Sequence, residues 1–137
     1  RTEQEVVEMA ELVVNVVSAE RALWHGTAKS VVAKTPDGEI GIMPGHEPVL
    51  ALLVDSALRI EETDGTRMLV AVHGGFFSVD SNQVNVIAEI AELAEDIDLD
   101  RAKVALAAAQ AANDEDTSAL RRAETRITVA GTVSALR

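Results

Sequence analysis

The sequence predicts a mainly β protein with an α tail, in which an N-terminal antiparallel β-sandwich of about ten strands precedes a C-terminal antiparallel two-helix hairpin. Up to about Ile97 the chain consists of short, valine-rich apolar runs separated by turns. Residues 98–137 contain no proline, one glycine (Gly131) and many alanines. Strands favour β-branched residues and helices favour alanine. We therefore expect an extension or tag at 1–8, a sandwich at 9–96 and a hairpin at 97–137.

The first eight residues, RTEQEVVE, precede Met9-Ala10-Glu11-Leu12, which resembles a natural start. A tag, an over-long gene prediction and a native extension all remain open for this segment. It therefore takes no part in the fold argument.

The first half of the sandwich is predicted from apolar runs and from turn residues. Its strand candidates are residues 12–17, 23–26, 28–33 and 39–42. Pro36 fixes φ and Gly38 accepts a positive φ, so these two residues predict a turn between the third and fourth candidates. The segment Pro44–Pro48 contains two prolines, which cannot donate to a β ladder, and is expected to be a loop.

The second half contains two hairpin signals. The run 49–54 is apolar throughout and too short to be assigned as a helix. Asp64-Gly65 then joins the alternating run 58–61 to the run 67–72, and Asp-Gly between two such runs is a strong hairpin signal. A turn at 80–82 joins two further strand candidates, residues 76–79 and 84–87.

The tail is expected to form two helices with thin apolar stripes. Asp98 or Asp100 caps a helix that runs to about Ala112, and Thr117 or Ser118 caps a second helix that runs to about Leu136. The stripes are Leu99, Ala102, Leu106 and Ala109 on the first helix, and Leu120, Ala123, Ile127 and Ala130 on the second. Alanine permits close approach but buries little area, so the hairpin either packs permanently on the sandwich or can detach from it.

Charge and composition exclude several classes of function. The net charge is −11, and residues 1–97 carry 17 acidic and 6 basic residues, whereas residues 98–137 carry 6 of each. An acidic chain without clustered Lys and Arg is not expected to bind nucleic acid. The chain has no Cys, which excludes disulfides and thiolate metal sites. We find neither an apolar run long enough for a membrane span nor a signal peptide, which favours a cytosolic protein.

No motif in the chain predicts a catalytic residue or a metal site. Residues 96–100 resemble the start of a calcium loop, but Arg101 stands at its glycine position and Ala107 at its glutamate position. His46 has no second histidine four residues later, which excludes a helical zinc motif. The chain contains no phosphate-binding glycine loop and no nucleophile elbow.

Four segments of the chain carry a resemblance to a known family. They are Leu12 to Gly26, Gly38 to Pro48 (GEIGIMPGHEP), Val72 to Val79 (VHGGFFSV) and the junction Ile97 to Ala102 (IDLDRA). From Met9 onward the chain resembles the ε subunit of the F-type ATP synthase. The fold of that family, a ten-stranded sandwich followed by a helical hairpin, agrees with the fold predicted from the pattern.

The resemblance implies a non-catalytic rotor subunit in the central stalk of a proton-translocating ATP synthase. It implies contacts with the γ subunit and the ring of c subunits, and inhibition of ATP hydrolysis when the tail extends into the α/β catalytic head. It also implies a peripheral position at the cytoplasmic face of the bacterial cell membrane. The residues that it assigns to the γ and c-ring contacts are Glu39, Ile40, Gly41, Gly45 and His46.

The family resemblance also extends to regulatory ATP, which some bacterial members bind on the folded-down hairpin; no cofactor is required. Matching residues are Ile97, Asp98, Arg101 and Ala102 at the junction, and Arg122 and Arg126 on the second helix. The two arginines are four residues apart and share one helix face, and guanidinium groups suit phosphate oxygens. Ala108 replaces a basic residue found in some ATP binders. Alternatively, Asp98 caps the helix and Arg101 pairs with acidic residues of the tail.

Two other functions can be compared with the sequence, a binding module and a hydrolase. A free-standing β-sandwich module with a helical partner-recognition tail would show the same pattern. A hydrolase would need a nucleophile arrangement, which we do not find. Co-purification distinguishes them, because a rotor subunit leaves membranes together with γ and the catalytic head.

Overall fold

The computed structural model describes residues 11–112 and 117–135. The predicted extension at 1–8 and the predicted loop at 113–116 lie outside these residues. Nine strands are described: β1 (Leu12–Ser18), β2 (Ala22–Thr35), β3 (Gly38–Ile42), β4 (Val49–Leu52), β5 (Ser56–Glu62), β6 (Arg67–His73), β7 (Phe76–Asp80), β8 (Gln83–Ala88) and β9 (Ile90–Leu93). The short 3-10 helix η1 (Ala94–Asp96) leads to α2 (Leu99–Ala111) and α3 (Ser118–Ala135).

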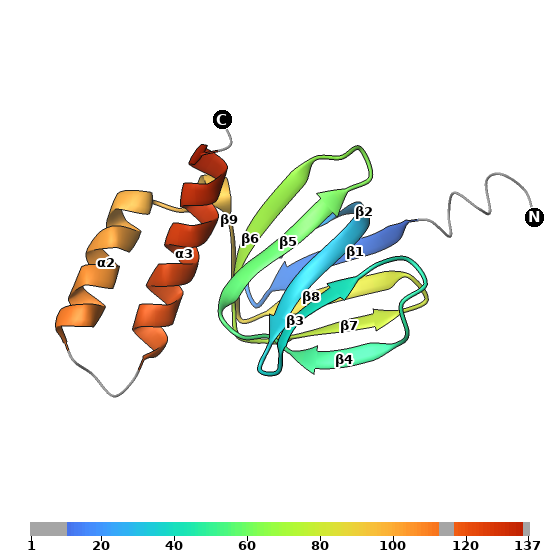
Figure 1. The fold of residues 1–137 in the computed structure, drawn as a ribbon, viewed down its shortest axis with the longest axis horizontal. Coiled ribbons are helices and arrows are strands. Elements are labelled where there is room, and N and C mark those ends of the chain that lie inside the picture. The colour runs from blue at the N-terminus through green and yellow to red at the C-terminus, as the bar shows by residue number, and fades with distance from the viewer. Residues whose placement is uncertain (1–10, 113–116, 136–137) are drawn as a thin grey trace, which may run out of the picture.

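The strands form a sandwich because β2 belongs to both of its layers. Residues 22–28 of β2 pair with β1, and residues 28–32 pair with β5 after a register shift near Ala28. The strand order is β4-β7-β8-β1-β2-β5-β6-β9, with β3 added to the second half of β2. Figure 1 shows this single path folded into two layers. We call them the β1 layer (β4, β7, β8, β1 and the start of β2) and the β6 layer (β3, the end of β2, β5, β6 and β9).

Two details differ from the predicted ten antiparallel strands. Residues 23–26 and 28–33 form one strand of 14 residues, since Gly26 continues the strand instead of ending it. A side chain at Gly26 would meet the Trp24 indole at 2.6 Å, so this glycine makes room for a large ring. In addition, β1 and β8 pair in parallel, because a period of two predicts a strand but not its partner or direction.

The core lies between the layers and is mainly aliphatic, as the composition indicates. Alternate residues of each strand fill it, such as Val14 and Val16 of β1 and Val70 and Val72 of β6, all fully buried. The chain crosses from β6 to β7 through Gly74 and Gly75, which both have positive φ. A side chain at Gly75 would lie 2.1 Å from the Ile87 carbonyl oxygen, so only glycine fits this crossing.

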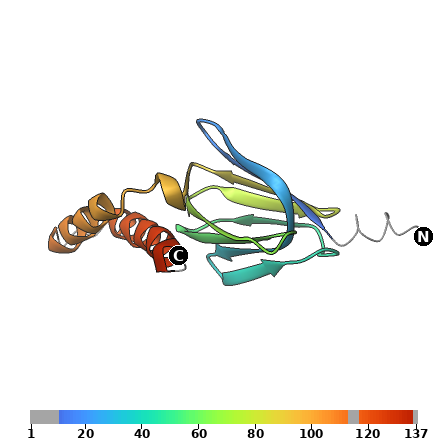
Figure 2. The same cartoon turned by 90° about the horizontal axis from the view of Figure 1, so that it is seen from above.

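The tail forms the predicted helical hairpin, with α3 between α2 and the sandwich (Figure 1, Figure 2). Of the two proposed caps for α2, Asp98 is the N-cap, and its side chain accepts a hydrogen bond from the Arg101 amide. The predicted stripe residues Ala102 and Ala123 are buried. Because α3 contacts both α2 and the β6 layer, its buried surface is wider than predicted and includes Thr125 and Val129.

Candidate functional site

The junction between the sandwich and the hairpin encloses a cavity of about 420 Å³, which we call the junction cavity. Its lining comes from β9, η1, the start of α2 and the middle of α3. The residues that line it are Glu92, Asp96, Ile97, Asp98, Arg101, Ala102, Ala105 and Arg126. Five of the six predicted nucleotide-site residues therefore meet in one place. Arg122, the sixth, does not line the cavity.

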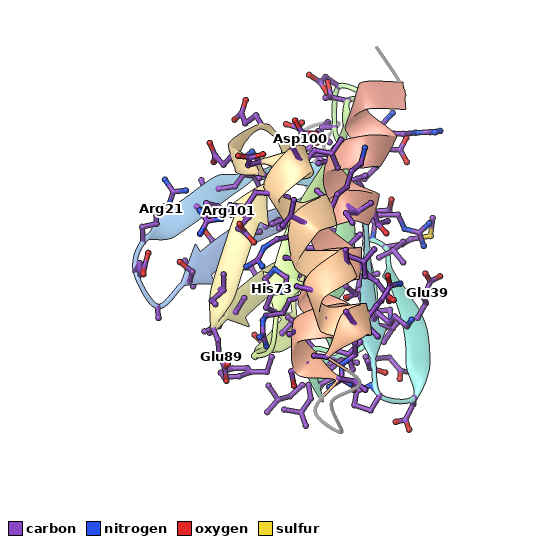
Figure 3. The ribbon with its side chains drawn as sticks, turned by 90° about the vertical axis from the view of Figure 1, so that its left-hand side faces the viewer. Arg21, Glu39, His73, Glu89, Asp100 and Arg101 are labelled. Atoms are coloured by element: carbon purple, nitrogen blue, oxygen red, sulfur yellow. The ribbon has the colours of Figure 1, made fainter. Side chains whose placement is uncertain are left out.

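The N-cap of α2 places the first residues of this helix at the cavity. Asp98 has an extended backbone, and its Oδ1 accepts the Arg101 backbone N–H at 3.0 Å. This cap uses the Arg101 amide and leaves its guanidinium available. Within the described ranges the Arg101 side chain makes no ion pair, so the predicted pairing with acidic tail residues is not observed there. Figure 3 shows Arg101 at the side of the hairpin opposite Glu39.

Arg126 ties α3 to the sandwich across the same cavity. Its Nε donates to Glu92 Oε1 at 2.7 Å, and the two side chains are 28% and 25% exposed. The same Glu92 oxygen accepts from His73 Nε2 at 3.1 Å. Neither Glu92 nor His73 is predicted from the sequence as a site residue. The one sequence feature that could have indicated this pair is a histidine at the end of an apolar strand. Glu92 has no such feature, because it approaches His73 only through the pairing of β9 with β6.

The contacts at the junction change the pKa of Glu92. The hydrogen bond from His73, followed by the hydrogen bond and the charge of Arg126, lowers the pKa of Glu92 below its ordinary value of 4.5, while burial opposes this shift. The cavity thus has three carboxylates (Glu92, Asp96 and Asp98) and two guanidinium groups (Arg101 and Arg126). Asp96 also forms an exposed ion pair with Arg21 at 3.6 Å. Such a lining suits a ligand that combines anionic groups with hydroxyl or N–H donors.

A second candidate surface is the outward face of the β1 layer, which no described helix covers. Cross-strand pairing aligns Leu52, Phe76 and Ile87 in one row. The adjacent row contains Leu50, Ser78, Asn85, Asn15 and His25. We call these eight residues the outer sheet face. Leu50 is 74% and Leu52 is 65% exposed, and neither row contains Lys, Arg, Asp or Glu.

Polar side chains of the outer sheet face bond to one another. Asn15 Nδ2 donates to Asn85 Oδ1 at 3.2 Å, and Asn15 Oδ1 contacts the His25 ring. The middle of this face therefore presents a fixed amide row beside an apolar row. Asp80 lies in the next outward row, paired with Gln83, so the absence of charge applies to the two rows of the outer sheet face. Two charge-free rows on a protein with a net charge of −11 are typical of a protein–protein interface, where charged residues are depleted.

Sequence comparisons agree with the fold and give the family. Residues 11–94 match the family model described as "ATP synthase, Delta/Epsilon chain, beta-sandwich domain". The ATP synthase epsilon chain of Rhodococcus jostii is 54% identical over 100 residues, which cover 72% of this chain and 82% of that protein. The epsilon chain of Streptomyces griseus is 46% identical over 118 residues, which cover 86% and 94%. The chain belongs to the ATP synthase epsilon chain family.

Solved structures show the same fold at low identity. A chain in a structure of Euglena gracilis mitochondrial ATP synthase (OSCP, F1 and c-ring) matches with a TM-score of 0.70 and 22% identity, covering 93% of this chain and 81% of that chain. A chain in a structure of the central stalk and c-ring of Tetrahymena thermophila mitochondrial ATP synthase matches with a TM-score of 0.57 and 15% identity, covering 90% and 96%. The sandwich-plus-hairpin fold is thus shared with chains of rotary ATP synthases.

The residues assigned to γ and c-ring contacts by the resemblance to the ε family do not form one cluster. Glu39, on β3, forms an ion pair with Arg59 at 3.0 Å and lines a groove that faces α3. Ile40 packs against the core, and Gly41 is exposed on the same strand. Gly45 instead donates its N–H to Asn82 Oδ1 at 2.7 Å near the β7–β8 turn, and His46 follows it in the same loop.

Over residues 11–112 and 117–135, no group of three or more His, Cys, Asp or Glu residues has the arrangement of a metal site. Among the same residues, neither α2 nor α3 has the length and hydropathy needed to cross a bilayer.

We predict that Glu92→Gln loosens the docking of α3. The variant keeps the size of Glu92 but replaces a charged hydrogen bond with a neutral one, a loss of about 1 kcal/mol or about fivefold in α3 opening. Because the pKa of Glu92 is lowered, its contribution is fully present above pH 4.5 and is lost as the pH falls through the lowered value. Amide exchange of α3, referenced to β6, measures both effects.

Glu124→Gln is the matched control for this change, since Glu124 is exposed on α3 and lines the other groove. It should leave α3 exchange at the wild-type level. Equal α3 exchange in wild type and Glu92→Gln at pH 7 would show that the Arg126 ion pair does not hold the hairpin.

Proposed function

We propose that this chain is the non-catalytic ε subunit of a proton-translocating F-type ATP synthase, located in the central rotor stalk. Family membership over the sandwich and most of the relatives' length supports this proposal. The observation that carries it is the outer sheet face, because a rotor subunit needs a broad uncharged surface to remain attached under torque. The chain would lie at the cytoplasmic face of the bacterial membrane as a peripheral protein, held there by the complex.

The γ subunit is the partner proposed for the outer sheet face. Leu50, Leu52, Phe76 and Ile87 are all at least 39% exposed, and their burial would provide the hydrophobic centre of an interface. The neighbouring amide row of Asn15 and Asn85 would fix the register by hydrogen bonding. The loop with Gly45 and His46, together with Glu39, Ile40 and Gly41 on β3, is proposed to contribute to the γ and c-ring contacts.

We predict that Leu52→Arg and Phe76→Arg each weaken retention of γ by at least about tenfold, because a charge would be buried without a partner. Both side chains are exposed in the free protein, so the fold should persist. The measurement is co-purification of γ and the catalytic head with the tagged chain from membranes. Arg67→Ala, an exposed change at the start of β6, is the matched control. Normal retention of γ by both variants would favour a free-standing binding module.

We propose regulation by the hairpin because α2 and α3 pack on each other and contact the sandwich through α3. α2 packs chiefly on α3, and α3 contacts the sandwich mainly at β5, β6 and η1. Among residues 11–112 and 117–135, the ion pair across this boundary is that of Arg126 with Glu92. A unit attached in this way can leave at modest cost and extend toward the α/β catalytic head, where it would restrain ATP hydrolysis.

Deleting residues 98–137 should leave an assembled complex that hydrolyses ATP faster. The expected increase is about tenfold if the tail restrains about nine complexes in ten. Hydrolysis by the reconstituted enzyme, with full-length and shortened chain at equal occupancy, measures it. An unchanged rate in a complex that still contains the shortened chain would exclude the inhibitory role.

ATP is proposed as a regulatory ligand of the junction cavity and not as a required cofactor. Arg101 and Arg126 would bind phosphate oxygens, Asp98 would lie near the sugar, and Ile97 and Ala102 would contribute apolar walls. Support comes from the convergence of these residues on one cavity of about 420 Å³. Arg122, predicted to bind phosphate, would have to reach the ligand from the neighbouring turn of α3.

We expect Arg101→Ala to weaken ATP binding by about tenfold or more, since it removes a charge-assisted bond of about 1.5–3 kcal/mol. Arg122→Ala should have a smaller effect, because Arg122 does not line the cavity. A titration of the isolated protein to millimolar ATP, followed by NMR, measures both. Lys103→Ala is the control, being exposed on the same helix outside the cavity. If no resonance of the junction or of α3 moves, ATP is not a ligand of this chain.

A further inference from the structure

Asn82, in the turn between β7 and β8, is hydrogen-bonded to two segments that are distant from it in the chain. Its side-chain Oδ1 accepts the Gly45 N–H at 2.7 Å, and its backbone carbonyl accepts the Val13 N–H at 2.8 Å. Val13 belongs to β1, and Gly45 belongs to residues 43–48, which we call the β3–β4 loop. Figure 1 shows that the start of β1 and the turn between β7 and β8 lie at the end of the sandwich opposite the hairpin.

The backbone of the β7–β8 turn explains why an asparagine can occupy this position. Ser81 and Asn82 have φ values of +50° and +63°, both in the left-handed region. Two such residues between the paired strand ends Asp80 and Gln83 are typical of a type I′ hairpin turn. Asparagine is one of the few residues with a side chain that tolerates this conformation. Asn82 therefore fits its own turn and still has a side chain that reaches the β3–β4 loop.

The hydrogen bond from Gly45 favours one conformation of the β3–β4 loop. The loop begins with a turn in which His46 donates its N–H to the Met43 carbonyl at 3.1 Å. Pro44 and Gly45 are the two central residues, and the φ of +90° at Gly45 is typical of a type II turn. Types I and II differ in the direction of their central peptide. Because Asn82 accepts the N–H of that peptide, it stabilises the type II turn.

The central peptide in turn orients the groups that the loop presents to its surroundings. The C=O and N–H of a trans peptide point in opposite directions, so the Pro44 carbonyl points away from Asn82. Met43, the first residue of the turn, is 64% exposed, and Gly45 is also exposed. The loop thus presents an apolar side chain near a carbonyl acceptor. Such a pair fits a partner surface that has a hydrogen-bond donor beside an apolar contact.

We propose that Asn82 is a positioning residue for the docking of the chain on the c-ring, because it holds the β3–β4 loop in its binding conformation before the partner is bound. A preformed loop loses less conformational freedom on binding, so Asn82 raises the affinity without touching the partner. The inference rests on the proposed function, in which Gly45 and His46 contribute to the γ and c-ring contacts. The c-ring is the partner chosen because the hairpin is proposed to extend toward the catalytic head, and the loop lies at the opposite end.

Asn82→Gly separates the two hydrogen bonds of Asn82. Glycine accepts the left-handed backbone and keeps the carbonyl that Val13 uses, so the turn should persist, whereas the side-chain acceptor is lost. In NMR spectra of the isolated full-length chain, the Gly45 amide should exchange with solvent about three- to tenfold faster, and its proton resonance should move upfield. Asn82→Asp keeps an acceptor oxygen at this position and should restore both properties.

Release of the labelled full-length chain from membrane-bound complexes measures the effect on docking. Asn82→Gly should be released about three- to tenfold faster than wild type, since the loss of one hydrogen bond changes the preformed population of the loop by about this factor. Asn82→Asp should be released at the wild-type rate, a rescue that a general weakening of the turn would not give. Ser81→Gly is the matched control, because Ser81 lies in the same turn and its hydroxyl donates to Asp80 at 3.1 Å.

An unchanged Gly45 amide in Asn82→Gly would overturn the positioning role. Equal release of wild type and Asn82→Gly, or equally fast release of Ser81→Gly, would also overturn it, while retention of the wild-type chain would still support the proposed function. If the wild-type chain itself is not retained by the complexes, the proposed function fails, and the docking role of Asn82 fails with it.

Discussion

The architecture depends on one long strand that belongs to two layers. The first half of β2 pairs with β1 and its second half pairs with β5, and the register shift near Ala28 lets the sheet turn between them. Both layers then bury one side of every strand against the other, which gives a core of aliphatic side chains. The outward faces of the two layers differ in what covers them. The face of the β1 layer stays open, whereas the face of the β6 layer is covered by α3.

The two outward faces are suited to different contacts, one to a partner and one to the helix α3. The open face has no charged side chain in its central rows, which suits permanent attachment to a partner. The covered face has small and polar groups, including Ala71, His73 and Glu92, on which a helix can rest without a deep hydrophobic lock. A change of one or two kcal/mol is enough to shift the docking equilibrium of a helix held in this way. The acidic body and the neutral tail follow the same division.

The junction connects the sandwich to the hairpin through a small network of charged groups. Glu92 bonds to His73 within the sandwich and to Arg126 of the hairpin, and the cavity beside it contains Asp98 and Arg101. The docking of α3 and the lining of the cavity therefore depend on the same few charges. Coupling of this kind requires no long pathway, since the groups are direct neighbours.

Much of this protein follows from local sequence. Valine-rich runs with Pro-Asp-Gly and Asp-Gly turns specify strands and hairpins because backbone preference acts over a few residues. The helices likewise follow from local signals, namely their alanine content and the Asp98 cap. The four matching residues of the junction motif, Ile97, Asp98, Arg101 and Ala102, line one cavity.

Only the tertiary structure determines the contacts between residues that are distant in the chain. The parallel pairing of β1 with β8, the union of two predicted strands across Gly26, and the bonds of Glu92 to His73 and Arg126 have no local signature. Nor does the sequence predict that Arg122 lies outside the cavity while Arg126, one turn later, lines it. Local preference fixes which residues form an element and which face is apolar, but the position of each element against another depends on the packing of the whole chain.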